Sequence, residues 1–119
     1  MIPIDELKKI PLLSELAGPE LMHLGSVLKE RRAPKGSYIV YAEDPGPSMM
    51  FIADGKVKVN LMSNDGKEVV LANMEEGEFF GEIALLTGSD RSANVIATSD
   101  CRLFVLHEED FTTHLTQYT

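Results

Sequence analysis

Several kinds of residue are scarce in this 119-residue chain, and each shortage excludes a class of protein. The single cysteine, Cys101, cannot form an internal disulfide, and it excludes a four-cysteine zinc or iron–sulfur site within the chain. There is no signal-peptide pattern and no apolar run of about 18 residues, the length that a membrane-spanning helix needs. The sequence therefore predicts a cytoplasmic protein without a membrane segment.

Positive charge is also scarce. The chain has 11 Lys and Arg residues against 19 Asp and Glu residues, which gives a net charge of −8. A protein that neutralises nucleic-acid phosphates usually presents a basic face, so a nonspecific nucleic-acid surface is not expected. Any anionic ligand must be held by local geometry, and the positions of the few arginines become informative.

The sequence contains no recognisable catalytic or metal-binding pattern. His23, His107 and His114 are not at metal-ligand spacings, which argues against a cupin-type metal site. No nucleophile can be paired with a base, and Cys101 is interpreted as a small buried hydrophobic residue. We therefore expect no catalytic residues, no metal and no catalytic cofactor, and we predict that the protein is not an enzyme.

The first part of the chain has helical periodicity. Ile4, Leu7 and Ile10 share one face before Pro11, and Gly18-Pro19 provides a typical helix start with proline in the first turn. An apolar stripe follows on the second helix, which predicts that it packs against the rest of the domain. We predict a helical N-terminal segment over residues 1–33.

After Pro34 the periodicity changes to about two, which is typical of strands. Expected strands are Tyr38–Ala42, Met49–Ala53, Lys56–Met62, Glu68–Met74, Asn94–Ala97 and Arg102–Leu106. Asp54-Gly55 and residues 63–66 are strong hairpin signals, because Asn, Asp and Gly tolerate positive φ. We predict one domain over residues 1–119: a β-roll at 34–107, then the start of a C-terminal helix at 108–119. The fold class is mainly β, an antiparallel jelly-roll-like β-barrel with flanking helices.

The residues from Gly81 to Ser92 have the chemistry of an anion site. Gly81 has no Cβ and lets the backbone approach a ligand closely, and one helical turn over 82–86 would direct free N–H groups at a phosphate. Arg91 can form a charge-assisted pair with phosphate oxygens, and Ser92 adds a hydroxyl donor. Glu82 would repel a phosphate but can accept a hydrogen bond from a sugar hydroxyl. An acid for a ribose and an arginine for a phosphate indicate a nucleotide.

The run FFGEIALLTGSDRSA at 79–93 resembles the phosphate-binding cassette of cyclic nucleotide-binding domains. The chain is most similar to the N-terminal sensor domain of bacterial catabolite-activator-type transcriptional regulators. The resemblance covers nearly the whole chain; its weaker signals are Pro11-Leu12-Leu13, Pro34-Lys35-Gly36, Asp44-Pro45-Gly46, Phe51-Ile52, Asp54-Gly55-Lys56-Val57 and Glu109-Asp110-Phe111. It implies the double-stranded β-helix form of the jelly roll.

Roles for the cassette residues follow from this resemblance. It implies that Glu82 binds the ribose 2′-hydroxyl and that Arg91 binds the cyclic phosphate. Ser92 and the backbone amides of Ile83 and Ala84 would complete the phosphate cradle, and Gly81 would give the close approach. In the family, serine after the arginine goes more often with cAMP and threonine with cGMP, so the expected ligand is cAMP, with cGMP as the alternative.

Two residues depart from the family pattern. Asp90 stands where proline often precedes the arginine, so Arg91 gains an acidic neighbour that can compete for it. Glu43 stands where glycine is common before Asp44, which affects the first long loop. Both departures put affinity in question more than function, because neither removes a side chain that contacts the ligand.

The resemblance also implies a regulatory role. Cyclic nucleotide binding would switch an attached output, expected to be a DNA-binding domain that this chain does not contain. Partners would be the cyclic nucleotide, a second copy through the C-terminal helix, and DNA only through that other domain. One alternative remains open: a β-roll scaffold for interaction or dimerisation, or a sensor of a different effector, in which Glu82 and Arg91 form an internal ion pair and the cassette is non-functional.

Overall fold

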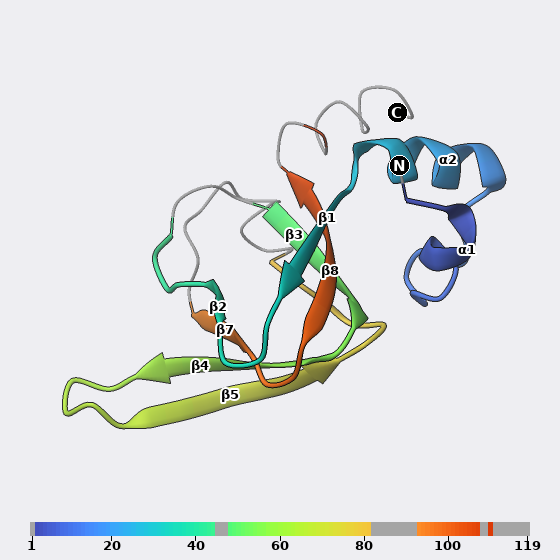
Figure 1. Ribbon diagram of the computed structural model, residues 1–119. Coiled ribbons are helices and arrows are strands. Elements are labelled where there is room, and N and C mark those ends of the chain that lie inside the picture. The colour runs from blue at the N-terminus through green and yellow to red at the C-terminus, as the bar shows by residue number, and fades with distance from the viewer. Residues whose placement is uncertain (1, 45–47, 82–92, 108–109, 111–119) are drawn as a thin grey trace.

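The computed structural model describes residues 2–44, 48–81, 93–107 and 110 (Figure 1). Its helices are α1 (Ile4–Leu7) and α2 (Gly18–Val27). Its strands are β1 (Lys29–Ala33), β2 (Tyr38–Val40), β3 (Ser48–Asp54), β4 (Lys56–Met62), β5 (Glu68–Glu75), β6 (Phe79–Phe80), β7 (Asn94–Ala97) and β8 (Cys101–His107). Neither of the two described helices is long and apolar enough to cross a membrane.

The strands form two four-stranded sheets in which every pairing is antiparallel. Sheet one has the order β1-β8-β3-β6, and sheet two has the order β2-β7-β4-β5. This arrangement confirms the predicted mainly β, jelly-roll-like fold with flanking helices. Across the described residues the strands form two separate sheets, so the predicted jelly-roll-like β-barrel is not closed.

The N-terminal helices pack against one face of sheet one. The apolar face of α2 buries Leu21 and Leu24, and Pro19 lies in its first turn as predicted. These helices form one hydrophobic cluster with strand residues of β3 and β8. Buried members from the two strands are Met49, Phe51, Phe104 and Leu106. Sheet one is thus covered by helices on this face.

A second hydrophobic cluster joins the two sheets. It contains Met50, Ile52 and Leu103 from sheet one together with Val57 and Val95 from sheet two. Met49 and Met50 therefore belong to different clusters, as the alternation of side chains along a strand requires. Cys101 is free and buried in this second cluster, which confirms its interpretation as a small hydrophobic residue.

The segment Lys29–Ala33 is not helical, although the sequence analysis placed it in the helical segment 1–33. It forms β1 and pairs with β8, in a register that places Arg32 opposite Arg102. Four of its five side chains are exposed and only Ala33 is buried, because β1 lies at the edge of sheet one. With almost no apolar alternation, the segment offers no strand signal in the sequence.

The expected hairpin at Asp54-Gly55 is also wrong. β3 pairs with β6 and β8, whereas β4 pairs with β5 and β7, so Asp54-Gly55 carries the chain from one sheet to the other. Gly55 has φ 101°, and a Cβ there would lie 2.5 Å from the carbonyl oxygen of Asp100. The turn at 63–66 does form a hairpin, between β4 and β5, closed by a 2.8 Å hydrogen bond from the Ser63 amide to the Lys67 carbonyl.

Candidate functional site

The predicted cassette begins in one sheet and ends in the other. Its first residues, Phe79 and Phe80, form β6 of sheet one and pair with β3. Its last residues lead into β7 of sheet two, where Val95 pairs with Val59 of β4. From β6 to β7 the chain thus passes from sheet one to sheet two, as it also does between β1 and β2 and between β3 and β4.

Of the predicted site residues, the structure describes Gly81 only. Glu82, Ile83, Ala84, Arg91 and Ser92 lie outside the described residues, as does Asp90. Gly81 follows the buried Phe80 and has φ 88°, in the left-handed region that a residue with a Cβ rarely adopts. The chain thus enters the cassette through a backbone conformation that favours glycine.

The polar side chain of Asn94 anchors the other end of the cassette. Its Nδ2 donates a 3.0 Å hydrogen bond to Oδ1 of Asn60, a β4 residue that is only 1% exposed. Asn60 in turn donates to the carboxylate of Glu68 on β5. Lys58 lies 2.8 Å from the same carboxylate and, together with Asn60, lowers the pKa of Glu68 below its ordinary value. A polar network therefore crosses β5, β4 and β7.

The same network reaches the loop that follows β2. The backbone amide of Ala42 donates a 2.7 Å hydrogen bond to Oδ1 of Asn94. The turn is closed by the Tyr41 amide, which donates to the Asp44 carboxylate, and by the Asp44 amide, which donates to the Tyr41 carbonyl. Glu43 has φ 68° in this turn and is the only non-glycine residue with positive φ in the described part of the chain. The family's usual glycine at this position is therefore explained by backbone conformation.

Arg102 is the best-paired arginine of the described residues. From β8 its guanidinium contacts three carboxylates, those of Glu6 at 2.6 Å, Asp54 at 3.0 Å and Glu30 at 3.2 Å. Burial alone would lower the pKa of Arg102, but the hydrogen bonds to these carboxylates raise it above its ordinary value. Its guanidinium also lies 5.3 Å from the ring centre of Phe104. Arg102 therefore ties α1, β1 and β3 to β8 and is not available to bind an anion.

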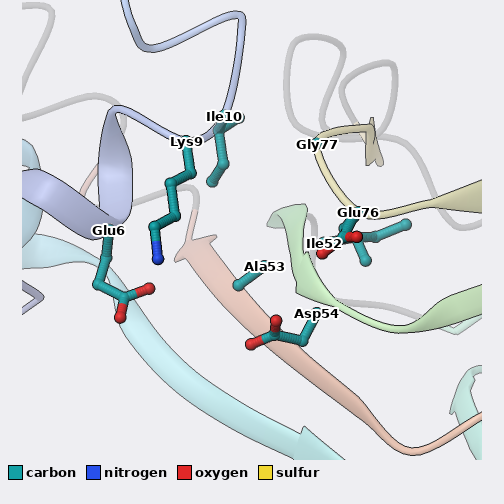
Figure 2. Close-up of a pocket in the computed structure, with 8 residues that line it drawn as sticks. All are labelled: Glu6, Lys9, Ile10, Ile52, Ala53, Asp54, Glu76 and Gly77. Carbon is teal, nitrogen blue, oxygen red and sulfur yellow. The ribbon is translucent and has the colours of Figure 1, made fainter.

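A cavity of about 180 Å³ lies beside this cluster, between α1, β3 and the turn before β6 (Figure 2). Figure 2 shows Lys9 directed toward carboxylates of Glu6 and Asp54, and Glu76 adds a third carboxylate to the lining. The lining carries three carboxylates and one amine, and Arg102 beside it is already paired with Glu6 and Asp54, so a phosphate-bearing ligand is disfavoured. Among the described residues, these three acids included, no group of three or more His, Cys, Asp or Glu side chains is placed to hold a metal ion.

Sequence reasoning missed both Asn94 and Arg102. The Arg102 contacts join residues 48, 72 and 96 positions apart, and no local pattern reports such distances. The signal for Asn94 was weak but present, because an amide beginning the otherwise apolar strand NVIA has to find a polar partner.

Comparisons with known proteins show the family of this chain. Residues 30–118 match the family model described as "Cyclic nucleotide-binding domain". The Cyclic AMP receptor protein of Thermus thermophilus is 36% identical over 105 residues, covering 88% of this chain and 49% of that protein. The chain spans between about a quarter and a half of the length of the first curated relatives that it matches.

Two solved structures show the same fold. The N-terminal domain of a transcriptional regulator from Streptomyces coelicolor A3(2) superposes with a TM-score of 0.84 at 28% identity, covering 94% of this chain and 78% of that one. The regulatory subunit of a cAMP-independent protein kinase A from Trypanosoma cruzi, bound to guanosine, gives a TM-score of 0.83 at 26% identity, covering 95% and 40%. The matched segment, residues 30–118, includes the whole predicted β-roll at 34–107 and the complete cassette. The chain belongs to the cyclic nucleotide-binding domain family.

Proposed function

We propose that this domain is a regulatory module that binds cAMP and transmits its occupancy to an attached output, without catalysing a reaction. The observation that carries the proposal is the family match over residues 30–118, which encloses the whole stretch from Gly81 to Ser92. The left-handed backbone at Gly81 supports it, because a ligand can approach closest where no Cβ intervenes.

In the proposed complex, different cassette side chains bind the ribose and the phosphate of the ligand. Glu82 accepts a hydrogen bond from the ribose 2′-hydroxyl, and Arg91 donates to the cyclic phosphate. Ser92 and the backbone amides of Ile83 and Ala84 supply the remaining donors. A net charge of −8 makes this local set of donors necessary, because the protein as a whole repels an anion.

The connection of the cassette to both sheets suggests how occupancy is transmitted. β6 belongs to sheet one, which packs on the N-terminal helices, and β7 belongs to sheet two. A ligand that binds one arrangement of the cassette more tightly shifts the domain toward the packing that accompanies it, by no more than the difference in affinity.

The proposed output is a DNA-binding domain in a longer protein. The similarity to the Thermus receptor and to the Streptomyces regulator supports this, and the chain covers 49% and 78% of those two chains. We place the module in the cytoplasm, as a homodimer through its C-terminal helix, with DNA contacted only by the additional domain.

A second candidate function is sensing a different effector. The similar Trypanosoma cruzi subunit belongs to a cAMP-independent protein kinase A and is bound to guanosine, which has a ribose but no phosphate. In this chain Asp90 precedes Arg91 and can pair with it, which would weaken phosphate binding. Such a sensor would depend on Glu82 and not on Arg91.

Calorimetric titration separates these functions. We expect the parent domain to bind cAMP more tightly than cGMP or guanosine. Arg91→Ala should lower cAMP affinity by about 10- to 150-fold, because a charge-assisted pair is lost. Glu82→Ala should cost about 1–3 kcal/mol of binding by leaving a ribose hydroxyl unpaired. Arg31→Ala, on the exposed face of β1, is the matched control and should bind as the parent does.

The opposite outcomes are equally specific. No heat and no thermal shift with millimolar cAMP or cGMP would refute cyclic nucleotide sensing. Binding of guanosine that survives in Arg91→Ala but not in Glu82→Ala would establish the second function instead.

A further inference from the structure

The polar pair Asn60–Asn94 occupies a position where an apolar pair would pack. Asn60 is 1% exposed, and its amide is satisfied on one side by Asn94 and on the other by Glu68. A buried amide stabilises a protein only when its hydrogen bonds are made, so such a pair adds a directional requirement that apolar residues do not. The pair fixes the two strands in one relative position.

The strand that needs this restraint is β7. It has only four residues, and both Val95 and Ile96 are buried, at 4% and 8% exposure, although their side chains point to opposite faces. A strand buried on both faces has no apolar–polar alternation to define its register. If its pairing shifted by one residue, apolar side chains would still be buried, so burial alone does not fix the register. The Asn60–Asn94 hydrogen bond joins the last register pair between β4 and β7 and thereby fixes the register of β7 against β4.

Asn94 holds a second segment as well. Its Oδ1 accepts the 2.7 Å hydrogen bond from the Ala42 amide, in the turn after β2. The side chain thus fixes the point at which the chain enters β7, two residues after Ser92, and also fixes that turn.

From this geometry we infer that Asn94, held by Asn60, is a positioning residue for nucleotide binding: it fixes the start of β7, the strand that follows the cassette in the chain. The inference rests on the proposed function. It predicts that loss of the amide pair weakens the binding of cAMP even when the fold is retained.

The decisive experiment compares one single and one double variant of this chain by cAMP calorimetry and thermal denaturation. Asn94→Leu leaves Oδ1 of the buried Asn60 without a donor, although its Nδ2 still donates to Glu68, and should lower both stability and affinity, the latter by about 5- to 20-fold. In Asn60→Leu/Asn94→Leu both partners are apolar, so stability should recover toward that of the parent. Affinity should not recover, because the Ala42 amide still has no acceptor and the register is no longer fixed.

The matched control is Asn73→Leu, an exposed asparagine of β5 in the same sheet, which should change neither property. Hydrogen exchange at the Ala42 amide gives a readout that needs no ligand, and it should be faster in both test variants. Parent-like cAMP affinity in either Asn94 variant would overturn the positioning role while leaving the proposed function intact. Recovery of affinity together with stability in the double variant would show a purely structural pair and would also overturn it. A parent domain that binds no cyclic nucleotide would refute the proposed function, and this inference with it.

Discussion

Sheet one and sheet two contribute different properties to this domain. The central strands β3 and β8 of sheet one are buried along most of their length, because the helices cover one face and sheet two covers the other. In sheet two, β5 exposes seven of its eight residues, among them Val69, Val70 and Leu71. The apolar burial that stabilises the fold is therefore concentrated in sheet one, whereas sheet two relies on polar contacts to fix β7, the strand that follows the cassette.

The largest expected effect tests the concentration of stability in sheet one. Phe104 of β8 is 1% exposed and packs between the helices and β3. Phe104→Ala should lower the free energy of unfolding by about 3–5 kcal/mol, through lost burial and the cavity left behind. Leu71→Ala, at an edge-strand residue that is 54% exposed, should change it by less than about 0.5 kcal/mol. Chemical denaturation measures both, and equal losses would contradict the comparison.

The next effect concerns the polar contacts of sheet one. Arg102→Met leaves the carboxylates of Glu6, Glu30 and Asp54 without their shared cation and should cost about 1–3 kcal/mol of stability. The control is Arg32→Met, at the residue paired with Arg102 in the register, whose side chain is 77% exposed and lies 3.9 Å from Glu30. An exposed ion pair of that kind should contribute less than about 0.5 kcal/mol. Similar losses of stability in the two variants would show that the contacts of Arg102 with three carboxylates stabilise the fold no more than one exposed ion pair does.

A smaller effect, of opposite sign, is expected in the turn after β2. Glu43 has φ 68°, a conformation that costs a residue with a Cβ about 1–2 kcal/mol. Glu43→Gly removes that strain but adds freedom to the unfolded chain, so the net gain should be about 0.5–1 kcal/mol. Thermal denaturation measures it. The control Glu43→Ala keeps a Cβ at the positive φ and should not be more stable than the parent. If it were, the gain in Glu43→Gly would come from removal of the charge and not from relief of strain.

The smallest effect is a pH dependence in sheet two. Hydrogen bonds from Lys58 and Asn60 lower the pKa of Glu68, so the folded state binds its proton less readily than the unfolded state does. This stabilisation is present above the ordinary carboxyl pKa, about 4, and is lost as the pH falls through the lowered value. Glu68→Gln should flatten that part of a plot of melting temperature against pH. Glu76→Gln, an exposed residue outside the network, should leave the acid slope as it is in the parent.

The sequence predicted those elements of the fold whose side chains alternate or whose helices have an apolar stripe. The bounds of β4 and β7 are those expected from the sequence, Lys56–Met62 and Asn94–Ala97. β1 was missed because KERRA carries no apolar alternation, and its strand conformation depends on pairing with β8, far along the chain. The crossing from sheet one to sheet two after β3 was missed because Asp54-Gly55 has the composition of a hairpin turn, while its geometry is decided by packing against Asp100.

The candidate site, too, was predicted only in part. Gly81 was predicted from its lack of a Cβ, and the structure adds that its φ is positive. The roles of Glu82 and Arg91 come from the family pattern and remain predictions. The Asn60–Asn94 pair could not be predicted from local sequence, because its members lie 34 residues apart and meet only when β4 pairs with β7.

We propose above all that a cyclic nucleotide binds in the cassette, the loop between β6 and β7. Titration of cAMP into isotopically labelled protein, followed by amide NMR shifts, tests it most directly. We expect the largest saturable shifts at Gly81 and Asn94, at the two ends of the loop between β6 and β7. Shifts at the buried centre of β8 should be small, and the response should be lost in Arg91→Ala. Absence of saturable shifts, or an unchanged response in Arg91→Ala, would contradict it.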